Sequence, residues 1–183
     1  MAKNYIWNGL SPKGDLIMAT QLSLRGASIG YRNFAGIEGQ YNKAGDRNFA
    51  VFMDIEQAEE LAQDGWNIKK LDEAKAELDD PENDFPKRPY LPVSVALDGM
   101  YPSQIYILRH DPESELANEE GYVATEVTSE SADILDSALI KNADVVIRPY
   151  NWSVNGNSGV KAYLRRLYVT LDEDEFASEY GIH

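Results

Sequence analysis

The sequence predicts a mainly β fold with inserted helices, organised as an OB-like Greek-key β-barrel with extended hairpins. Three observations support it: β-prone runs separated by turns recur along the chain, the first run has internal glycines, and a helical segment precedes the last two runs. Five or more strands with one helix inserted before the final pair is the pattern of this barrel. A plain β-sandwich is the alternative.

The first β-prone run covers residues 22–34 and contains Gly26 and Gly30, which is typical of a strand that bends or bulges. A polar loop at 35–47 separates it from a strand at 48–54, so the two form a hairpin with a long tip. Residues 55–65 then predict a short helix, because they are rich in Glu and Ala and end at Gly65.

The middle of the chain alternates strands with acidic connectors. We expect strands at 66–71, 90–97 and 104–108. Residues 72–89 form an acidic excursion, helical at first and then broken by three prolines, and residues 111–122 form a polar loop.

The last third holds the clearest elements. Residues 128–140 predict a helix, with Thr128 or Ser129 as N-cap and apolar residues at helical spacing. Residues 143–171 predict a hairpin around the turn sequence NGNSG.

The 183-residue chain is long enough for one domain with a real core. We expect a peripheral N-terminal arm at 1–17, the OB-like barrel at 18–171 and an acidic C-terminal tail at 172–183. The chain has no Cys, which excludes disulfides and thiolate chemistry. Without an apolar run of membrane-spanning length or a signal peptide, the expected location is the cytoplasm.

Charge is unevenly distributed in a chain whose formal net charge is −14 at pH 7. Residues 145–171 contain four basic side chains and no acidic one, and residues 16–53 and 87–110 are also locally positive. The acid gathers in the predicted helices and connectors. Helices favour Glu and strands expose fewer residues, so part of this segregation is expected without any function.

Alternation along the closing hairpin places its basic and aromatic residues on one face. Side chains on a strand point alternately to opposite sides, so residues at every second position share a face. With the turn near Asn157 and Ser158, Trp152 is expected opposite Tyr163, and Tyr150 opposite Arg165. The alternation breaks after Arg165, which predicts a bulge at Arg165 or Arg166. The predicted patch comprises Arg148, Tyr150, Trp152, Lys161, Tyr163 and Arg165.

Such a patch suits single-stranded nucleic acid. Bases stack on aromatic rings at roughly 1–3 kcal/mol each, and interleaved Arg and Lys neutralise phosphates. The competing interpretation is a hairpin whose rings pack on a neighbouring loop and whose arginines pair with carboxylates.

A second basic and aromatic cluster surrounds the first hairpin and joins the candidate site. We expect Phe49 and Phe52, by contrast, to be buried in the following strand. Trp66, Lys69 and Lys70 form a weaker third group, for which a core role is equally consistent. The second cluster comprises Tyr31, Arg32, Phe34, Tyr41, Lys43 and Arg47.

The sequence also resembles a known family. The runs NFAGIEGQYNKAGDRNFAVF, DGWNIKKL, PYLPVSVAL and NADVVIRPYNWSVNGNSGVKAYLRRLYVTL, followed by an acidic end, are similar to single-stranded DNA-binding proteins of tailed bacteriophages. The resemblance covers most of residues 22–176 and concerns overall organisation. It implies an OB-type barrel with a basic groove, and an acidic tail that competes for the groove and contacts replication partners.

The C-terminal LDEDEFASEYGIH matches that tail in charge and in its aromatics, Phe176 and Tyr180. It departs from the family by being short and by ending in Ile182 and His183. A frayed amphipathic helix packed on the barrel is the alternative.

Other chemistries have weaker support. No phosphate loop, dinucleotide fingerprint or nucleophile elbow is present, and His110 and His183 are too few for a His-rich metal site. Asp54 and Glu56 are the least poor candidates for a magnesium-dependent nuclease, but acids at a helix start explain them equally. We expect no cofactor, no metal and no enzymatic activity.

The sequence therefore predicts a sequence-nonspecific single-stranded DNA-binding protein acting in phage DNA replication or recombination, in the host cytoplasm if phage-encoded. Its expected partners are single-stranded DNA and, through the tail, replication or recombination proteins; no membrane is involved, and a homo-oligomer is left open. The alternative is an acidic phage structural or regulatory module that contacts proteins and no DNA.

Overall fold

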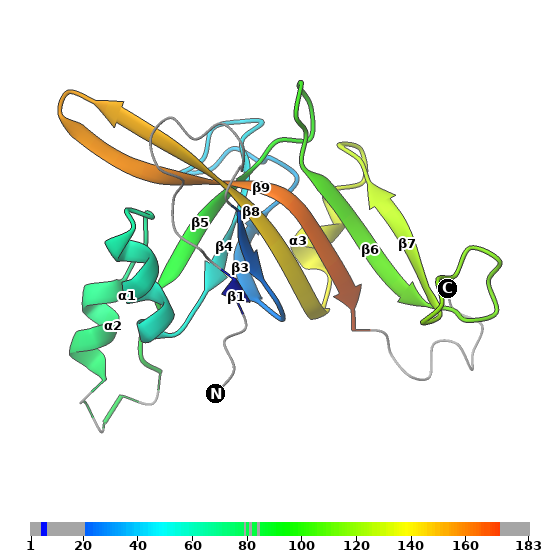
Figure 1. Ribbon diagram of the computed structural model, residues 1–183, viewed down its shortest axis with the longest axis horizontal. Coiled ribbons are helices and arrows are strands. Elements are labelled where there is room, and N and C mark those ends of the chain that lie inside the picture. Colours follow the sequence, from blue (N-terminus) through cyan, green and yellow to red (C-terminus); the bar gives the residue numbers. More distant parts are fainter. Residues whose placement is uncertain (1–4, 7–20, 79, 81, 84, 173–183) are drawn as a thin grey trace.

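The computed structural model describes residues 5–6, 21–78, 80, 82–83 and 85–172. It confirms a mainly β fold with inserted helices (Figure 1). The helices are α1 (Ile55–Gln63), α2 (Leu71–Glu77) and α3 (Ile134–Ser137). The strands are β1 (Tyr5–Ile6), β2 (Leu22–Leu24), β3 (Ser28–Asn33), β4 (Arg47–Phe52), β5 (Tyr90–Val95), β6 (Gln104–His110), β7 (Tyr122–Val127), β8 (Ile140–Val154) and β9 (Asn157–Leu171).

The strands form one curled sheet. Its main path runs β1-β2-β8-β9-β5-β4-β3, and the β6–β7 pair is attached to β9. The strands β2 and β3 lie far apart on this path, yet residues 25–27 alone separate them in the chain. The backbone N–H of Ala27 donates to Ala143 O of β8 at 2.8 Å, which holds the start of β3 close to β8, the neighbour of β2. The arrangement is OB-like and partly open, because β2 and β3 do not pair.

The bend predicted within residues 22–34 is confirmed at Gly26. This glycine has φ +61°, a left-handed conformation that residues with a Cβ rarely adopt. Its N–H donates to Asp144 Oδ1 at 2.9 Å, which fixes the corner against β8. One continuous segment thereby supplies two strands, β2 to β8 and β3 to β4.

The strand β9 is shared between two neighbours. Its first half pairs in parallel with β5 at Ala162 and Tyr163, and its second half pairs in parallel with β6 from Arg166 to Thr170. Between these halves the β8–β9 register shifts, since Val146 pairs with Arg166 and Ile147 with Leu164. Arg165 is the extra residue, so the predicted bulge is confirmed.

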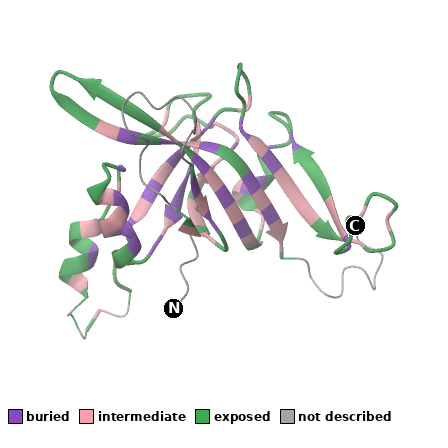
Figure 2. Ribbon diagram, viewed as in Figure 1, coloured by how far each residue is buried: buried purple, intermediate pink, exposed green. Residues whose placement is uncertain are grey.

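The core lies on the inner face of the curled sheet (Figure 2). Alternation along β5 shows the pattern, because Leu91, Val93 and Val95 are buried and the residues between them are half-buried. Trp66 is also buried, which confirms a core role for it. The largest fully buried side chains include Phe34, Phe49, Leu22, Leu61, Leu91, Ile105, Leu135, Ile147 and Leu167.

The helices α1 and α2 sit together beside the start of β5 (Figure 1). Asp54 caps α1 by accepting a hydrogen bond from Gln57 N at 2.7 Å. Lys75 of α2 forms an ion pair with Glu59 of α1. Among the described residues, no helix has the length and hydrophobicity to cross a lipid bilayer.

Three sequence predictions of secondary structure need correction. Residues 66–71 form isolated bridges at Trp66 and Lys69 instead of a strand, because α2 begins at Leu71. The helix expected at 128–140 is reduced to α3. Thr128–Ser131 and Ser131–Ile134 close as four-residue turns, and Ile140 already belongs to β8. The strand β7 was missed altogether, although its Val123, Thr125 and Val127 are β-branched at alternate positions.

Candidate nucleic-acid interface

The β8–β9 hairpin extends beyond the body of the sheet (Figure 1). It closes through Asn155 and Gly156, whose φ values of +51° and +80° suit a tight two-residue hairpin turn. Val154 therefore pairs with Asn157, and the expected centre at Asn157 and Ser158 is wrong. Asn-Gly is the sequence that this turn favours, and that signal was available in the chain.

The corrected register changes the cross-strand partners but preserves the shared face. Arg148 pairs with Tyr163, Tyr150 with Lys161, and Trp152 with Gly159. The expected pairs of Trp152 with Tyr163 and of Tyr150 with Arg165 are therefore wrong. The observed register differs by an even number of residues, so the same side chains remain on one side of the ribbon.

Tyr163 is the centre of this face. The Arg148 guanidinium carbon lies 5.9 Å from the centre of its ring, and the Lys161 ammonium nitrogen lies 5.0 Å from it. Tyr150 meets the same ring edge-on, with ring centres 6.0 Å apart. Tyr163 is half-buried, whereas Tyr150 and both cations are exposed. The group combines rings that can stack on bases with cations that can reach phosphates.

Trp152 lies flat on the opposite strand, where Gly159 has no side chain to obstruct it. A Cβ on Gly159 would lie 2.9 Å from the indole Cζ2. The indole remains 40% exposed and borders a hollow of about 420 Å³, which Pro92, Ser94 and Lys161 also line. An open aromatic ring beside a hollow can receive a flat ligand.

Arg165 is exposed at the bulge, where its guanidinium donates to Gln21 Oε1 at 2.7 Å. Among the described residues, no carboxylate oxygen lies within 4.0 Å of the charged groups of Arg148, Lys161 or Arg165. Pairing with carboxylates, the competing interpretation of these cations, is therefore not seen in the part of the chain described.

The first hairpin places its expected site residues differently. Tyr41 is 93% exposed, and Lys43 is exposed beside it. The side-chain amide of Asn42 shapes this loop by donating to the carbonyls of Ile37, Lys43 and Asp46. Both candidates are available to a ligand at the loop tip.

Three other candidates of this cluster have structural roles. Phe34 is fully buried and stacks on Phe49 with ring centres 5.2 Å apart, so its assignment to the interface is corrected to the core. The Arg32 guanidinium donates to the carbonyls of Leu135 and Ala138, which ties β3 to the end of α3. Arg47 donates to Phe34 O at the base of the loop.

The two hairpins meet across β5. The row Asn48, Ser94, Tyr163, Arg148 consists of successive cross-strand partners on β4, β5, β9 and β8. A hollow of about 260 Å³ is lined by Arg47 from the first hairpin and by Lys161 and Tyr163 from the closing hairpin. Parts of both predicted clusters therefore border one surface.

Sequence reasoning missed one part of this surface. Phe52 was assigned to the core, yet it is half-buried, and it pairs with Tyr90 on the outer side of the sheet. Tyr31, 69% exposed, contacts both rings, and Arg88 lies over Phe52 at 5.4 Å. The signal was present in the spacing, because Phe49 and Phe52 are three residues apart and cannot share a face of one strand.

The nuclease alternative depended on Asp54 and Glu56 as metal ligands. No group of three or more His, Asp or Glu side chains that could hold a metal ion occurs among them. The carboxylate of Asp54, one of the two nuclease candidates, caps α1. Helix capping accounts for its position.

An OB-like sheet whose outer face carries open aromatic rings and cations without carboxylate partners is typical of proteins that bind single-stranded nucleic acid. A family model described as "Putative phage ssDNA-binding domain" matches residues 14–182. The chain therefore belongs to this family of phage single-stranded DNA-binding domains. No curated protein sequence matches it.

Similar solved structures include single-stranded DNA-binding protein from bacteriophage Enc34. Its C-terminal truncation is 12% identical with a TM-score of 0.47, over 95% of this chain and 93% of that one. The same phage protein in complex with ssDNA is 10% identical with a TM-score of 0.43, over 85% of this chain and 89% of that one. Both scores are below 0.5, so the family assignment rests on the family model.

Proposed function

We propose that the protein binds single-stranded DNA without sequence preference, through base stacking on aromatic rings and phosphate contacts from Arg and Lys, during phage DNA replication or recombination. The observation that carries the proposal is the outer face of the β8–β9 hairpin, where Arg148 and Lys161 flank the Tyr163 ring. Every base has a π-face, so rings of this kind bind with little regard to sequence.

The proposed contact residues fall into two groups. The closing hairpin contributes Arg148, Tyr150, Trp152, Lys161, Tyr163 and Arg165, and the first hairpin contributes Tyr31, Tyr41 and Lys43. Arg32 and Arg47 hold the backbone of this surface in place, since their guanidinium groups donate to backbone carbonyls. Phe34 is excluded because its ring is buried.

The positions of the acidic residues are consistent with the same proposal. The ion pairs described on α1 and α2 hold Glu59, Glu73 and Glu77 against Lys75 and Lys87. An acidic surface repels the dense charge of duplex DNA and leaves binding to the local basic face. The acidic tail lies outside the described residues, and contact with replication or recombination proteins is its proposed role.

The direct test is fluorescence anisotropy of labelled oligo-dT titrated with the protein. We expect tight binding at low salt that weakens with ionic strength, with a slope of log K against log salt of about −3 for roughly four phosphate contacts. Binding that is absent even at low salt would overturn the proposal. The same assay with magnesium checks for cleavage, which would show an enzyme instead.

The hairpin itself is tested by the double variant Tyr150→Ala/Trp152→Ala. Loss of one to two stacked bases should weaken binding by about 2 kcal/mol or more, while the exposed positions leave folding intact. Tyr101→Ala, at an exposed tyrosine between β5 and β6, is the matched control. Unchanged affinity in a folded double variant would place the site elsewhere, and a protein-interaction module would then be sought by pull-down after nuclease treatment.

A further inference from the structure

Three aromatic rings gather where β3, β4 and β5 lie side by side. The centre of the Tyr31 ring lies 5.5 Å from that of Phe52 and 5.3 Å from that of Tyr90, and the last two are 5.7 Å apart. We name this group the Tyr31 platform. All three rings contact each other at tilted or edge-on angles, as aromatic pairs prefer.

The Tyr31 platform shares a face with the closing hairpin. Phe52 pairs with Tyr90 and Asn48 with Ser94, and both pairs lie on alternate positions of β4 and β5 opposite the buried set. Ser94 pairs with Tyr163, so the outer face continues from the platform to the hairpin. The four residue steps from Phe52 to Asn48 span about 13 Å, and two strand spacings add about 10 Å across the sheet.

The backbone is distorted to present Tyr31. The β3–β4 register gains one residue between Gly30 and Asn33, and within this bulge Tyr31 adopts φ +45°. A bulky residue in this region is strained, and such strain is found at binding and catalytic sites more often than elsewhere. If Tyr31 stabilised the core, its side chain would be buried, yet it is 69% exposed.

Phe52 is also given room by a glycine. A Cβ on Gly30 would lie 2.6 Å from the Phe52 Cε2 atom, so only a glycine allows this ring to cover β3. Trp152 covers Gly159 on the hairpin in the same manner. Both ends of the outer face thus carry an aromatic ring laid over a glycine of the neighbouring strand.

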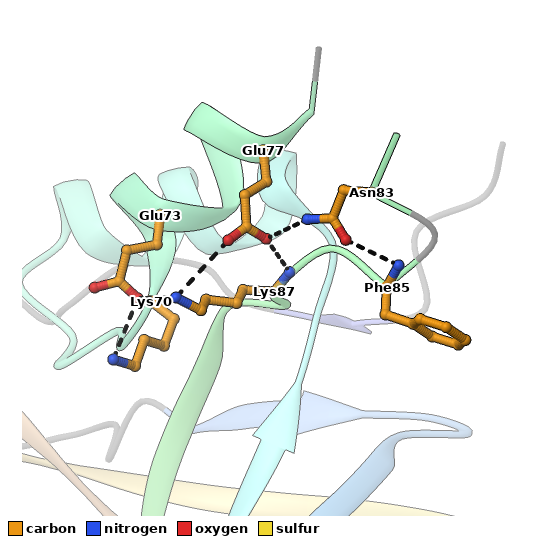
Figure 3. Close-up of polar contacts among 6 residues, drawn as sticks. All are labelled: Lys70, Glu73, Glu77, Asn83, Phe85 and Lys87. Atoms are coloured by element: carbon orange, nitrogen blue, oxygen red, sulfur yellow. Dashed lines mark hydrogen bonds and ion pairs between the residues drawn. The ribbon is translucent and has the colours of Figure 1, made fainter. Parts of the chain in front are cut away.

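One cation lies directly over the platform. The Arg88 guanidinium lies over the Phe52 ring, and among the described residues no carboxylate comes within 4.0 Å of it. Its neighbour Lys87 points the other way, to Glu77 at 3.7 Å (Figure 3). Lys70, at φ +63°, is a second strained residue beside the rings. Lys70 forms an ion pair with Glu73 at 3.2 Å, and this hydrogen bond and charge raise the pKa of Lys70, so Lys70 adds no unpaired cation to the platform.

From this arrangement we propose that the Tyr31 platform is a second stacking site for single-stranded DNA, with Arg88 holding an adjacent phosphate. A bound strand would run from the β8–β9 hairpin across β9, β5 and β4 to the platform. The inference rests on the proposed function and deepens it. It requires that affinity depend on whether one oligonucleotide is long enough to reach both regions.

The test compares oligo-dT of about 5 and about 16 nucleotides, within the range of OB-fold site sizes. Tyr31→Ala/Arg88→Gln should lower the affinity for the long oligonucleotide by about five- to 100-fold and leave the affinity for the short one unchanged. Tyr150→Ala/Trp152→Ala should weaken both. Tyr31→Phe keeps a ring and should bind like the wild type, as should the control Tyr101→Ala.

Photocrosslinking of the unaltered protein avoids any question of folding. Oligo-dT carrying iodouracil near one end should crosslink to the peptide with Tyr31 or Tyr90 in the long oligonucleotide only. Three outcomes would overturn the platform while the proposed function stands. Tyr31→Ala/Arg88→Gln could bind as tightly as the wild type, it could lose affinity equally for both oligonucleotide lengths, or no crosslink could form at these peptides. No binding of either oligonucleotide by the wild type would overturn both.

Discussion

At the residue scale, glycines decide how aromatic side chains are displayed. Gly159 does not have a left-handed φ, so alanine fits the backbone there, but its Cβ would come within about 3 Å of the Trp152 indole. The indole would have to swing off the strand. The glycine is therefore important for the ring that it exposes, rather than for the turn beside it.

Gly159→Ala should weaken single-strand binding roughly fivefold, because one stacking surface is displaced. Stability should change by no more than about 1 kcal/mol, since alanine is the better strand residue. Anisotropy and urea unfolding measure the two effects. Gly39→Ala is the matched control, because a Cβ there meets nothing within 4 Å; equal affinity of both variants would contradict the role given to Gly159.

The strand face on which each side chain lies was predictable, but how deeply the side chain is buried was not. Period-two alternation placed Arg148, Tyr150 and Trp152 on one face, and the register confirms that they share it with Tyr163. Phe34 follows a bulge, where alternation no longer tells inside from outside. The cross-strand partners were wrong because Asn155 and Gly156 form the turn.

At the element scale, α3 is fastened to the end of β3 from both directions. Asp136 accepts hydrogen bonds from Phe34 N at 2.6 Å and Ala35 N at 3.1 Å. Arg32 returns two bonds to carbonyls at the end of α3. These four hydrogen bonds, which we call the clasp, hold Phe34 in the core and set where the long loop with Tyr41 begins.

Asp136→Ala should lower the free energy of unfolding by about 2 kcal/mol, since two backbone donors lose a charged acceptor. Urea unfolding followed by circular dichroism measures it. Asp133→Ala, at the N-cap of the same short helix, removes no side-chain capping bond and should change stability little. A loss shared by both variants would show that helix propensity, and not the clasp, is responsible.

The elements that were mispredicted share a physical cause. Residues 128–140 have helical spacing, but the clasp on Asp136 and the start of β8 at Ile140 leave room for one turn. Residues 66–71 are β-prone, yet a tight connection into α2 limits them to single bridges. Tertiary contacts decided both, and local sequence does not encode them.

At the scale of the whole molecule, the mainly β, OB-like fold class was predictable, because it follows from the order of strands and helices along the chain. The β6–β7 extension was not, since it depends on the bulge that frees the second half of β9 for a new partner. The division into arm, barrel and tail stays a prediction. Of the arm, Tyr5 and Ile6 are described, and they pair with β2.

A ligand that binds the folded sheet and not the unfolded chain stabilises the whole molecule. At 100 times its dissociation constant, oligo-dT should add about 2.7 kcal/mol, which corresponds to a rise in melting temperature of roughly 5–10 °C. Thermal scanning with oligo-dT and with duplex DNA of equal length measures it. Equal shifts with both ligands would contradict preference for single strands.

The corner at residues 25–27 takes the place of strand pairing between β2 and β3. A barrel closed by a full ladder has a diameter fixed by its strand number and stagger. Here β2 and β3 are joined by a glycine corner, and the hydrogen bonds described for it come from Gly26 and Ala27. The girth of this sheet is therefore set at one point, by the bonds that hold the corner to β8, and not by a ladder of backbone hydrogen bonds between β2 and β3.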